Sequence, residues 1–541
     1  MIDYVAETFT DEEREILAPH FTDLDGPVFA LVNLPETVKG ALFARYSRSP
    51  KSLRRLFLDE FADQAGAGAA GAEIGSARAE ELYERIFLEY GDDSVAQLGG
   101  AHLACEQSSQ LLAKVLERGR FAAYLEQSTR YVPYDDRPGG RWRYVTPPEL
   151  DGPGLEDYAA ALDASFETYA RWLDPLQDYL RGRYPQEPGD SDFVYRMTIR
   201  AKACDTLRGL LPAATSSNVG IFATGQSYEQ LLLRMRAHPL EEVRDYAAMM
   251  LAELRKVIPA FLTRVDLPGR GRDWSWYMAG TRGALSDRAE ALLSGVQADP
   301  AGPEVELTDF DPEGEVKVVA ACLYETTGLP DHVLLGEARA MGAEARLSVL
   351  RAAIGDRTNR RHKPGRGFER TDYRFDVLCD YGAFRDLQRH RPLTIQWQRL
   401  SPDHGYDIPP EVEDAGLLKD WTRTMAEGAS LANAIREAGF PDIAQYAVPM
   451  AYRVRFAMQM NAREAMHLIE LRTTPQGHPS YRRVGQQMHR LIANVAGHRA
   501  LAAAMKFADH STVDLERLEA ERRTEARRRA AAETSDAEPA S

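Results

Sequence analysis

The stretch RFDVLCDYGAFRDLQRHRPLTIQWQRLSP, Arg374 to Pro402, changes its periodicity within a short length of chain. Apolar residues alternate with polar ones from Tyr373 to Cys379, which predicts a half-buried strand. Phe384 and Leu387 are spaced for one face of a short helix. We expect this helix to end near Pro392, because proline lacks the amide donor and restricts the residue before it. The stretch therefore predicts a strand that is followed directly by a helix.

Three basic residues, Arg389, His390 and Arg391, stand where this strand-helix unit ends. A guanidinium is a rigid fork of donors that suits phosphate oxygens, and an imidazole titrates near neutral pH. One interpretation is a site for an anionic cofactor or nucleotide. The other is a basic helix end that suits the helix dipole and contacts only water. From these residues alone the second interpretation is favoured, by roughly two to one.

The order of residues around this point resembles that of a known family. RHRPLT, Arg389 to Thr394, resembles the RHRxxS core of the flavin-dependent thymidylate synthases, whose full signature is RHRxxSxNExSxRY. Thr394 stands for the serine. The second part of the signature is lost here, because Gln396, Trp397 and Arg399 stand where Asn, Glu and Ser belong.

The missing part occurs near the front of the chain, in RGRFAAYLEQSTRYV, Arg118 to Val132. Placed on the same signature, this segment lacks the histidine and the first serine, which are replaced by Gly119 and Ala123. It keeps six residues of the pattern, namely Arg118, Arg120, Glu126, Ser128, Arg130 and Tyr131. The chain thus carries the signature twice, and the two copies are altered in complementary halves.

Two further family motifs are divided in the same way. The run from Arg208 to Pro212 resembles RxxLP, whose arginine holds the nucleotide phosphate, whereas Gln445 replaces that arginine in the second copy. Val448 to Arg472 resembles LPxxxxTRFxxxxNARxxxxxLxLR, whereas the first copy has Thr224 and Gln226 where the family has Asn-x-Arg.

The helix expected after the NAR motif has a mixed face. Asn461, Ala465, Leu468 and Arg472 share one side at helical spacing. Polar ends around an apolar middle suit a flat ring system, with an amide and a guanidinium at its edges. The alternative is a core helix with two polar residues that reach out to solvent.

The flavin-holding segment of the family, GHxSxxEH, is weakly matched. Glu89 to Gly100 keeps only the Gly and Ser of the pattern. Gly355 to Arg370 occupies the corresponding place in the second copy, where His362 and Glu369 could stand for the His and Glu if residues are inserted between them.

The resemblance implies an α+β fold with two tandem domains, each a central antiparallel sheet with long helices. We expect the first repeat at residues 1–280, an acidic linker rich in Gly and Pro at 281–315, the second repeat at 316–510, and a charged helix with a disordered tail at 511–541. Periodic apolar residues predict long amphipathic helices from Leu155 to Leu180 and from Val412 to Gly439. The apolar run from Val316 to Tyr324 predicts a buried strand.

Composition limits the possible functions. The formal net charge of −16 disfavours a nucleic-acid binder, although local arginine clusters could bind a small phosphate. The four cysteines are far apart and form no CxxC pair, so neither a zinc site nor a disulfide framework is indicated. The first residues are acidic and no apolar run reaches membrane-spanning length. We therefore expect a cytoplasmic protein without membrane or metal partners.

By the resemblance, the reaction is reductive methylation of dUMP to dTMP. FAD is the implied cofactor, with NADPH and methylenetetrahydrofolate as co-substrates. Arg472 would stabilise charge on the pyrimidine. The nucleotide would be held by Glu126, Ser128, Arg130, Arg208 and Arg472, and the flavin by Arg389, His390, Arg391, Asn461, Arg463 and His467. A homodimer of the tandem chain would imitate the homotetramer of the family, with composite sites between repeats.

A second hypothesis accounts for the same missing signature residues. The chain could be a degenerate protein that binds a nucleotide or flavin without turnover. Flavin affinity separates the two hypotheses, because the weakest matches all lie in the flavin segments. A nucleic-acid binder that uses the arginine clusters is a third, disfavoured interpretation.

Overall fold

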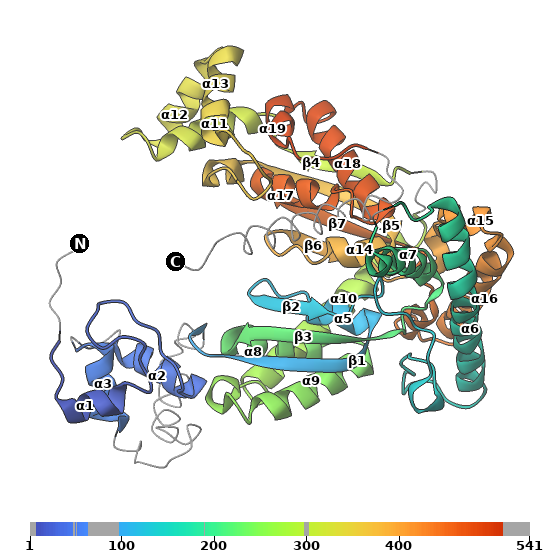
Figure 1. Cartoon of the computed structure of the whole chain (residues 1–541), viewed down its shortest axis with the longest axis horizontal. Coiled ribbons are helices and arrows are strands. Elements are labelled where there is room, and N and C mark those ends of the chain that lie inside the picture. The colour runs from blue at the N-terminus through green and yellow to red at the C-terminus, as the bar shows by residue number, and fades with distance from the viewer. Residues whose placement is uncertain are drawn as a thin grey trace. The chain divides into compact units, whose positions relative to one another are not determined.

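The computed structural model describes residues 7–46, 49, 51–62, 97–188, 190–296 and 302–511. Most of the first flavin-like segment and the charged C-terminal segment lie outside these residues. The predicted α+β class is confirmed, since the chain forms two small antiparallel sheets among many helices (Figure 1). The chain divides into two compact units. The first comprises residues 1–108, 115–126 and 218–296, and the second comprises 109–114, 127–217 and 297–541.

The first sheet has the strand order β1-β3-β2. Its strands are β1 (Gly100–Ser109), β2 (Ala122–Glu126) and β3 (Ser216–Thr224). The helices near it in the chain are α1 (Asp11–Leu17), α2 (Glu36–Tyr46), α3 (Leu53–Glu60), α5 (Gln110–Leu116), α8 (Gly225–Arg236), α9 (Glu241–Leu254), the 3-10 helix η6 (Pro259–Leu262) and α10 (Gly271–Leu293).

The second sheet has the order β4-β5-β7-β6 and lies in the second unit. Its strands are β4 (Val305–Phe310), β5 (Asp372–Asp380), β6 (Thr394–Trp397) and β7 (Arg453–Asn461). The α-helices of this unit are α6 (Gly152–Arg183), α7 (Asp192–Leu207), α11 (Gly314–Tyr324), α12 (Asp331–Ala340), α13 (Ala343–Ile354), α14 (Tyr381–Leu387), α15 (Pro410–Asp414), α16 (Leu418–Glu437), α17 (Ala462–Arg472), α18 (Pro479–Asn494) and α19 (Arg499–Ala504). Its 3-10 helices are η4 (Pro138–Gly140), η5 (Arg208–Leu210), η7 (Arg366–Arg370), η8 (Pro402–His404) and η9 (Ile443–Ala447).

The two sheets repeat one pattern. In each, a strand leads into a seven-residue helix, α5 or α14, and then into a short strand that pairs with a later nine-residue strand. The register is the same. Tyr124, six residues after Arg118, lies opposite Ile221, and Ile395, six residues after Arg389, lies opposite Met458. Among the described residues, the second sheet has one strand that the first lacks, β4 at its edge.

A reciprocal set of backbone hydrogen bonds joins the two RxxLP-like segments inside the second unit. Pro212 and Pro449 form an isolated antiparallel bridge. On both sides of it, each bond from one half has a counterpart from the other: Ala213 N to Val448 O at 2.9 Å, Met450 N to Leu211 O at 2.9 Å, Ala214 N to Tyr446 O at 3.0 Å and Ala451 N to Gly209 O at 3.0 Å. This pattern is that of a local two-fold axis.

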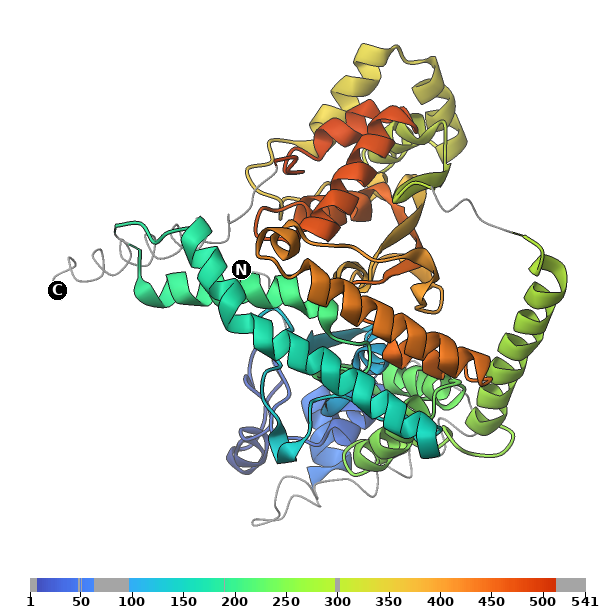
Figure 2. The ribbon, with the colours of Figure 1, turned by 90° about the vertical axis from the view of Figure 1, so that its right-hand side faces the viewer.

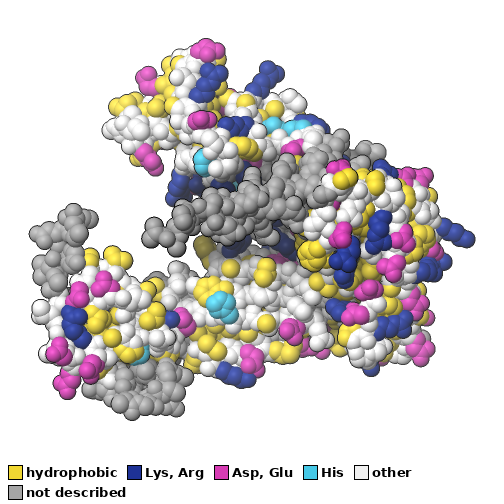
Figure 3. All heavy atoms as spheres, viewed as in Figure 1, with side chains coloured by type: hydrophobic (Ala, Val, Ile, Leu, Met, Phe, Trp, Pro, Cys, Tyr) yellow, Lys and Arg dark blue, Asp and Glu magenta, His cyan; other side chains and the backbone are white. Residues whose placement is uncertain are grey.

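The long helices pack beside this junction. The amphipathic helix predicted from Leu155 is confirmed as α6, which runs alongside α16 (Figure 2). Trp172 Nε1 donates to Asp420 Oδ2 at 2.7 Å between them. Trp421 is fully buried, and a Cβ on Gly209 would lie 2.6 Å from its ring, so this close approach requires glycine. Figure 3 shows acidic and basic side chains interspersed over α6 and α16.

Some predicted elements need correction. The prediction of a strand from Val316 to Tyr324 is wrong, because these residues form helix α11. A continuous apolar run does not distinguish a buried helix from a buried strand. The segment 281–315 contains the end of α10 and all of β4. The expected helix from Val412 is divided into α15 and α16, with Gly416 at a φ of 79° between them. The strand and helix predicted around Phe384 are confirmed as β5 and α14.

Candidate functional site

Nine charged or polar side chains of the second unit form one connected group, which we call the polar cluster. Three of them come from the first half of the chain and six from the second. They are Arg130, Asp205, Arg208, Asp386, His390, Glu464, Arg472, His478 and Tyr481.

At one end of the cluster, His390 is held between two partners. Its Nδ1 lies 2.9 Å from Glu464 Oε1, and its Nε2 accepts from Arg472 Nε at 3.0 Å. Because a guanidinium nitrogen only donates, Nε2 must carry the lone pair and Nδ1 the proton. His467 Nδ1 lies 3.3 Å from the other Glu464 oxygen. Glu464 therefore fixes the imidazole, and the imidazole fixes the guanidinium of Arg472.

The protonation states agree with this arrangement. Burial lowers the pKa of His390 to about 4, although the hydrogen bond with Glu464 acts against the shift. Burial alone would raise the pKa of Glu464, but hydrogen bonds from His390 and His467 lower it to about 2. At neutral pH the pair is thus a carboxylate and a neutral imidazole that donates to it.

Arginines and carboxylates alternate through the rest of the cluster. Asp386 Oδ1 lies 3.8 Å from Arg472 Nη1, and its Oδ2 lies 3.8 Å from Arg208 Nη1. Asp205 Oδ1 lies 3.4 Å from Arg208 Nη1 and 3.0 Å from Arg130 Nε. Burial would raise the pKa of Asp386, but Arg472 and the other nearby arginines lower it. Both carboxylates are therefore charged at neutral pH and partly offset three cations.

Two further side chains close the cluster on the side of helix α18. Burial lowers the pKa of His478 to about 3, although Asp205 acts against the shift; His478 Nε2 lies 4.0 Å from Asp205 Oδ1. Arg130 Nη1 donates to Tyr481 Oη at 3.4 Å, and the Arg472 guanidinium lies 5.5 Å from the centre of the Tyr481 ring. Tyr481 thus contacts an arginine from each half.

The hydrogen bonding of this region is incomplete. Arg208 Nη2 and Gln388 Oε1 are buried without a hydrogen-bond partner, and the Gln110 amide has none at either atom. Arg208 passes close to Gly382 at the start of α14, where an added Cβ would lie 2.9 Å from Asp380 Oδ1 and 3.0 Å from Arg208 Nε. Buried donors and acceptors without partners are costly. An anion with several oxygens would satisfy a donor such as Arg208 Nη2.

The other predicted nucleotide residues have structural roles near the cluster or lie apart from it. Ser128 Oγ accepts from Arg130 N at 3.3 Å and so shapes the turn that presents Arg130. Glu126 is buried in β2 of the first unit, opposite Val219. The structure thus brings together Arg130, Arg208 and Arg472 of the predicted set.

Three of the predicted flavin residues, Asn461, Arg463 and His467, lie at the N-cap of α17 or within this helix. Asn461 caps this helix, because its side chain accepts from Glu464 N at 2.9 Å. Ala465 and Leu468 are fully buried, so the protein's own core covers the apolar middle of the face that was expected to meet a ring. Arg463 Nε donates to Pro364 O at 2.9 Å, and its Nη1 lies 3.5 Å from Glu369. Arg389 and Arg391 are exposed.

A phosphate-bearing flavin fits part of this donor set. Arg391 is exposed, and Arg463 and His467 on α17 are partly exposed, so all three are accessible cationic or imidazole donors. Such donors pair well with diphosphate oxygens. His390 offers no further ring atom, because both nitrogens are already used. The residues that fit FAD are thus the accessible Arg391, Arg463 and His467, and not the buried His390.

His390, Glu464 and His467 place possible metal-ligating atoms within 4.8 Å of one another. The tautomer of His390 disfavours this use. Arg472 takes the Nε2 lone pair, so Nδ1 is protonated and has no lone pair for a metal. A cation here would also face the Arg472 guanidinium.

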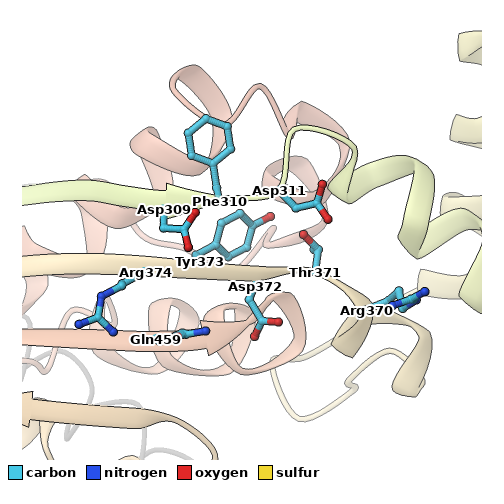
Figure 4. Close-up of a pocket in the computed structure, with 9 residues that line it drawn as sticks. All are labelled: Asp309, Phe310, Asp311, Arg370, Thr371, Asp372, Tyr373, Arg374 and Gln459. Carbon is cyan, nitrogen blue, oxygen red and sulfur yellow. The ribbon is translucent and has the colours of Figure 1, made fainter.

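Of two cavities in the second unit, one borders the polar cluster and the other lies away from it. One of about 850 Å³ includes Asp205 and His478 in its wall, so it borders the cluster. A smaller one of about 230 Å³ lies beside β4 and β5 and shares no residue with the cluster. Figure 4 shows its carboxylates Asp309, Asp311 and Asp372 spread around Tyr373.

Sequence reasoning missed five members of the cluster: Asp205, Asp386, Glu464, His478 and Tyr481. Two had a local signal. Asp205 precedes Arg208 by one helical turn, and Glu464 follows the capping Asn461 by three residues, as in a helix start. Asp386, His478 and Tyr481 had none, because their partners are distant in the chain.

The fold and the site define an α+β protein with a buried arginine-rich cluster that suits an anionic ligand. Comparison with known proteins then identifies the group. The model of the Thy1 family, thymidylate synthase complementing protein, matches residues 41–260 and again 306–497. The chain belongs to this family.

Relatives fall into two sets. A UPF0159 protein of Chlamydia muridarum is 39% identical over 96% of this chain and 99% of its own, and one of Thermoplasma acidophilum is 32% identical over 89% and 97%. A flavin-dependent thymidylate synthase of Mycobacterium sp. (strain JLS) is 31% identical over 34% of this chain and 70% of its own. Among solved structures, the UMP/dUMP methylase PolB from Streptomyces cacaoi matches with a TM-score of 0.30 and 20% identity, over 38% of this chain and 97% of that chain.

Within the described residues, no helix has both the length and the hydropathy to cross a bilayer.

Proposed function

We propose that the protein is a flavin-dependent methyltransferase that converts dUMP to dTMP at one composite site per chain. The observation that carries this proposal is the polar cluster, in which Arg130 and Arg208 of the first half meet Arg472 of the second. A site assembled this way needs only one intact copy of each motif. It accounts for the complementary losses as specialisation of a tandem duplication.

In this proposal the residues of the two halves of the chain have different roles. Arg130 and Arg208 bind the nucleotide phosphate, since guanidinium forks pair with phosphate oxygens. Arg472 stabilises negative charge on the pyrimidine. Glu464 and His390 hold Arg472 in place, and the neutral His390 adds no competing charge. Asp386 lies between Arg208 and Arg472 and partly offsets their positive charge.

Bound FAD would supply the hydride that completes the methyl group, with methylenetetrahydrofolate as carbon donor and NADPH as reductant. Arg391, Arg463 and His467 would hold its phosphates at the rim of α17. We further propose a homodimer in the cytoplasm, with no nucleic-acid partner.

The alternative is a nucleotide-binding protein without turnover. It is favoured by the state of the second flavin-like segment, where Glu369 is already paired with Arg366 and Arg463. Flavin retention decides between the two proposals.

The test is the visible absorption spectrum of the purified protein, with FAD and then dUMP added. We expect a flavin spectrum that shifts with dUMP. Arg130→Ala should abolish the shift and leave flavin bound, because Arg130 serves the nucleotide. Arg463→Ala should weaken flavin retention. The matched control is Arg399→Ala, at the signature position in the second half that corresponds to Ser128, where an exposed pair with Asp442 is lost. Absence of any flavin spectrum at saturating FAD would overturn the redox proposal.

A further inference from the structure

A groove lies between helices α13 and α19, away from the polar cluster. Its volume is about 590 Å³, which falls in the range of small-molecule sites. Leu347, Leu350, Ile354, Ala500 and Ala503 supply apolar surface to it. None of the groove's residues belongs to the nucleotide or flavin set, and none has a role in the proposed reaction.

The walls of the groove are held by interactions outside its apolar surface. Glu315 Oε1 accepts from the backbone N–H groups of Ala500 and Leu501 at 2.6 and 3.1 Å. Ala504 O accepts from the buried Arg357 at 2.8 Å. Helix α19 is thereby fixed at both ends, so the groove is formed before any ligand arrives.

The groove carries four cations and little compensating charge. Arg346, Arg351, Arg499 and Lys506 line it, and its only carboxylate, Glu315, is used by backbone donors. Within the described part of the chain, the three arginines form no side-chain hydrogen bond or ion pair, and Lys506 has only Asp356 at 3.8 Å. The chain as a whole carries a net charge of −16, so this local excess of positive charge is unusual for it.

The cavity of about 850 Å³ provides the contrast. Its cations are neutralised by its own walls: Lys202 pairs with Glu411 at 2.5 Å, Arg453 with Asp407 at 2.6 Å and Arg483 with Glu304 at 2.7 Å. A ligand there would have to displace internal pairs. In the α13–α19 groove an anion would meet Arg346, Arg351 and Arg499, whose side chains form no ion pair with the described residues.

We propose that the α13–α19 groove is a binding site for a small amphiphilic anion with an aliphatic or aromatic body. The apolar floor would cover the body, and Arg346, Arg351 and Arg499 would pair with its carboxylate, sulfonate or phosphate. The floor offers no side-chain hydrogen-bonding group for reading a polar ring. A nucleobase is therefore a poorer occupant than a simple apolar body.

The test titrates the full-length protein with two probes, anilinonaphthalene sulfonate by fluorescence and decanoate by calorimetry. We expect one molecule of either probe to bind per chain, each displacing the other, with binding weakened by added salt. Arg351→Glu should weaken both at least tenfold. Ala503→Trp, which fills the groove without changing charge, should do the same. Arg490→Glu on the exposed side of α18 is the matched control and should have no effect.

Three results would overturn the proposal. The first is no saturable binding of either probe. The second is equal affinity for decanol, which lacks the charge. The third is binding that survives both Arg351→Glu and Ala503→Trp. Sedimentation with vesicles that contain anionic phospholipid separates a free anion from a lipid headgroup in a bilayer. Cosedimentation that Arg351→Glu abolishes would assign the same chemistry to a membrane lipid. Flavin spectra are recorded in parallel, so a failure here is distinguishable from a failure of the proposed function.

Discussion

The strand-helix unit β3–α8 and the unit β7–α17 have the same backbone plan but very different polar content. Each nine-residue strand runs directly into a helix capped by a Thr or Asn side chain. At β7–α17, Glu464 and Arg472 are linked through His390 by a series of hydrogen bonds. The corresponding positions in the first half are Ser227, Gly119 and Met235. None of these three hydrogen-bonded side chains has a counterpart of the same type in the first half.

The opposite difference holds at the RxxLP-like segments. Arg208 enters the polar cluster, whereas Gln445 at the matching position bonds locally, accepting from Leu400 N at 3.1 Å and donating to Asp442 O at 3.0 Å. Arg130 corresponds to Ser401. The difference teaches that a shared backbone carries no function by itself. Each half keeps the frame and only part of the chemistry.

The largest expected effect concerns a buried ion pair of the second half. Arg357 and Glu470 are almost fully buried and form two hydrogen bonds of 2.7 and 2.5 Å. The residue that corresponds to Glu470 in the first half is the buried Leu233. Glu470→Leu alone should lower the free energy of unfolding by about 3–5 kcal/mol, because it leaves Arg357 charged and unpaired.

The double variant Arg357→Met/Glu470→Leu sharpens the comparison. It gives this position the apolar character of the first half and should recover most of the lost stability. Urea unfolding of both variants measures the difference. A double variant as unstable as the single one would show that the two halves are not interchangeable here.

The second expected effect concerns catalysis. Arg472→Met introduces the first-half residue and should lower dTMP formation by about 100-fold, if Arg472 stabilises charge on the pyrimidine. Glu464→Gln should lower it less, by about tenfold, because the guanidinium remains but its support is weakened. Single-turnover formation of dTMP measures both. Equal losses in the two variants would contradict a positioning role for Glu464.

The third effect is on pH dependence and belongs to His390. Its pKa is lowered from 6.5 to about 4 in the folded chain, so the unfolded chain binds more protons between these values. Stability should therefore fall as pH drops from 6.5 toward 4, by about 2 kcal/mol. His390→Gly, the first-half residue, should remove this part of the slope. The midpoint of urea unfolding from pH 7 to 4.5 checks it, with His332→Gly on α12 as control.

The smallest effect compares the two RxxLP-like segments directly. Arg208→Gln should weaken dUMP binding by about tenfold, as loss of one charged hydrogen bond to phosphate would. Gln445→Arg should leave it unchanged, because that position bonds outside the polar cluster. Calorimetric titration with dUMP measures both. Stronger binding in Gln445→Arg would indicate a second nucleotide site in the chain.

Sequence reasoning succeeded where local periodicity and motif order carry the signal. The strand β5, the helix α14 and the long helix α6 were predictable from apolar spacing alone. Arg130, Arg208 and Arg472 could be chosen from motifs far apart in the chain, and the structure brings them together. It failed at α11, where an unbroken apolar run has no period to read.

Asp386 could not be predicted from the sequence, for a physical reason. Asp386 matters because it lies between Arg208 and Arg472, and this position depends on two segments that only folding brings near it. The glycine at position 119 is also understandable only in three dimensions. A Cβ there would lie 2.4 Å from Tyr124 Oη, so the first half has closed over the place of the imidazole.

The bridge at Pro212 and Pro449 has a consequence for how such a chain can change. Its four hydrogen bonds join backbone atoms only, so no side-chain replacement removes a donor or acceptor unless it introduces proline. In a symmetric assembly of identical subunits, every mutation appears in all copies at once. Here the same contact joins two independently encoded segments. Either segment can therefore change without its counterpart, which identical subunits of a symmetric assembly cannot do.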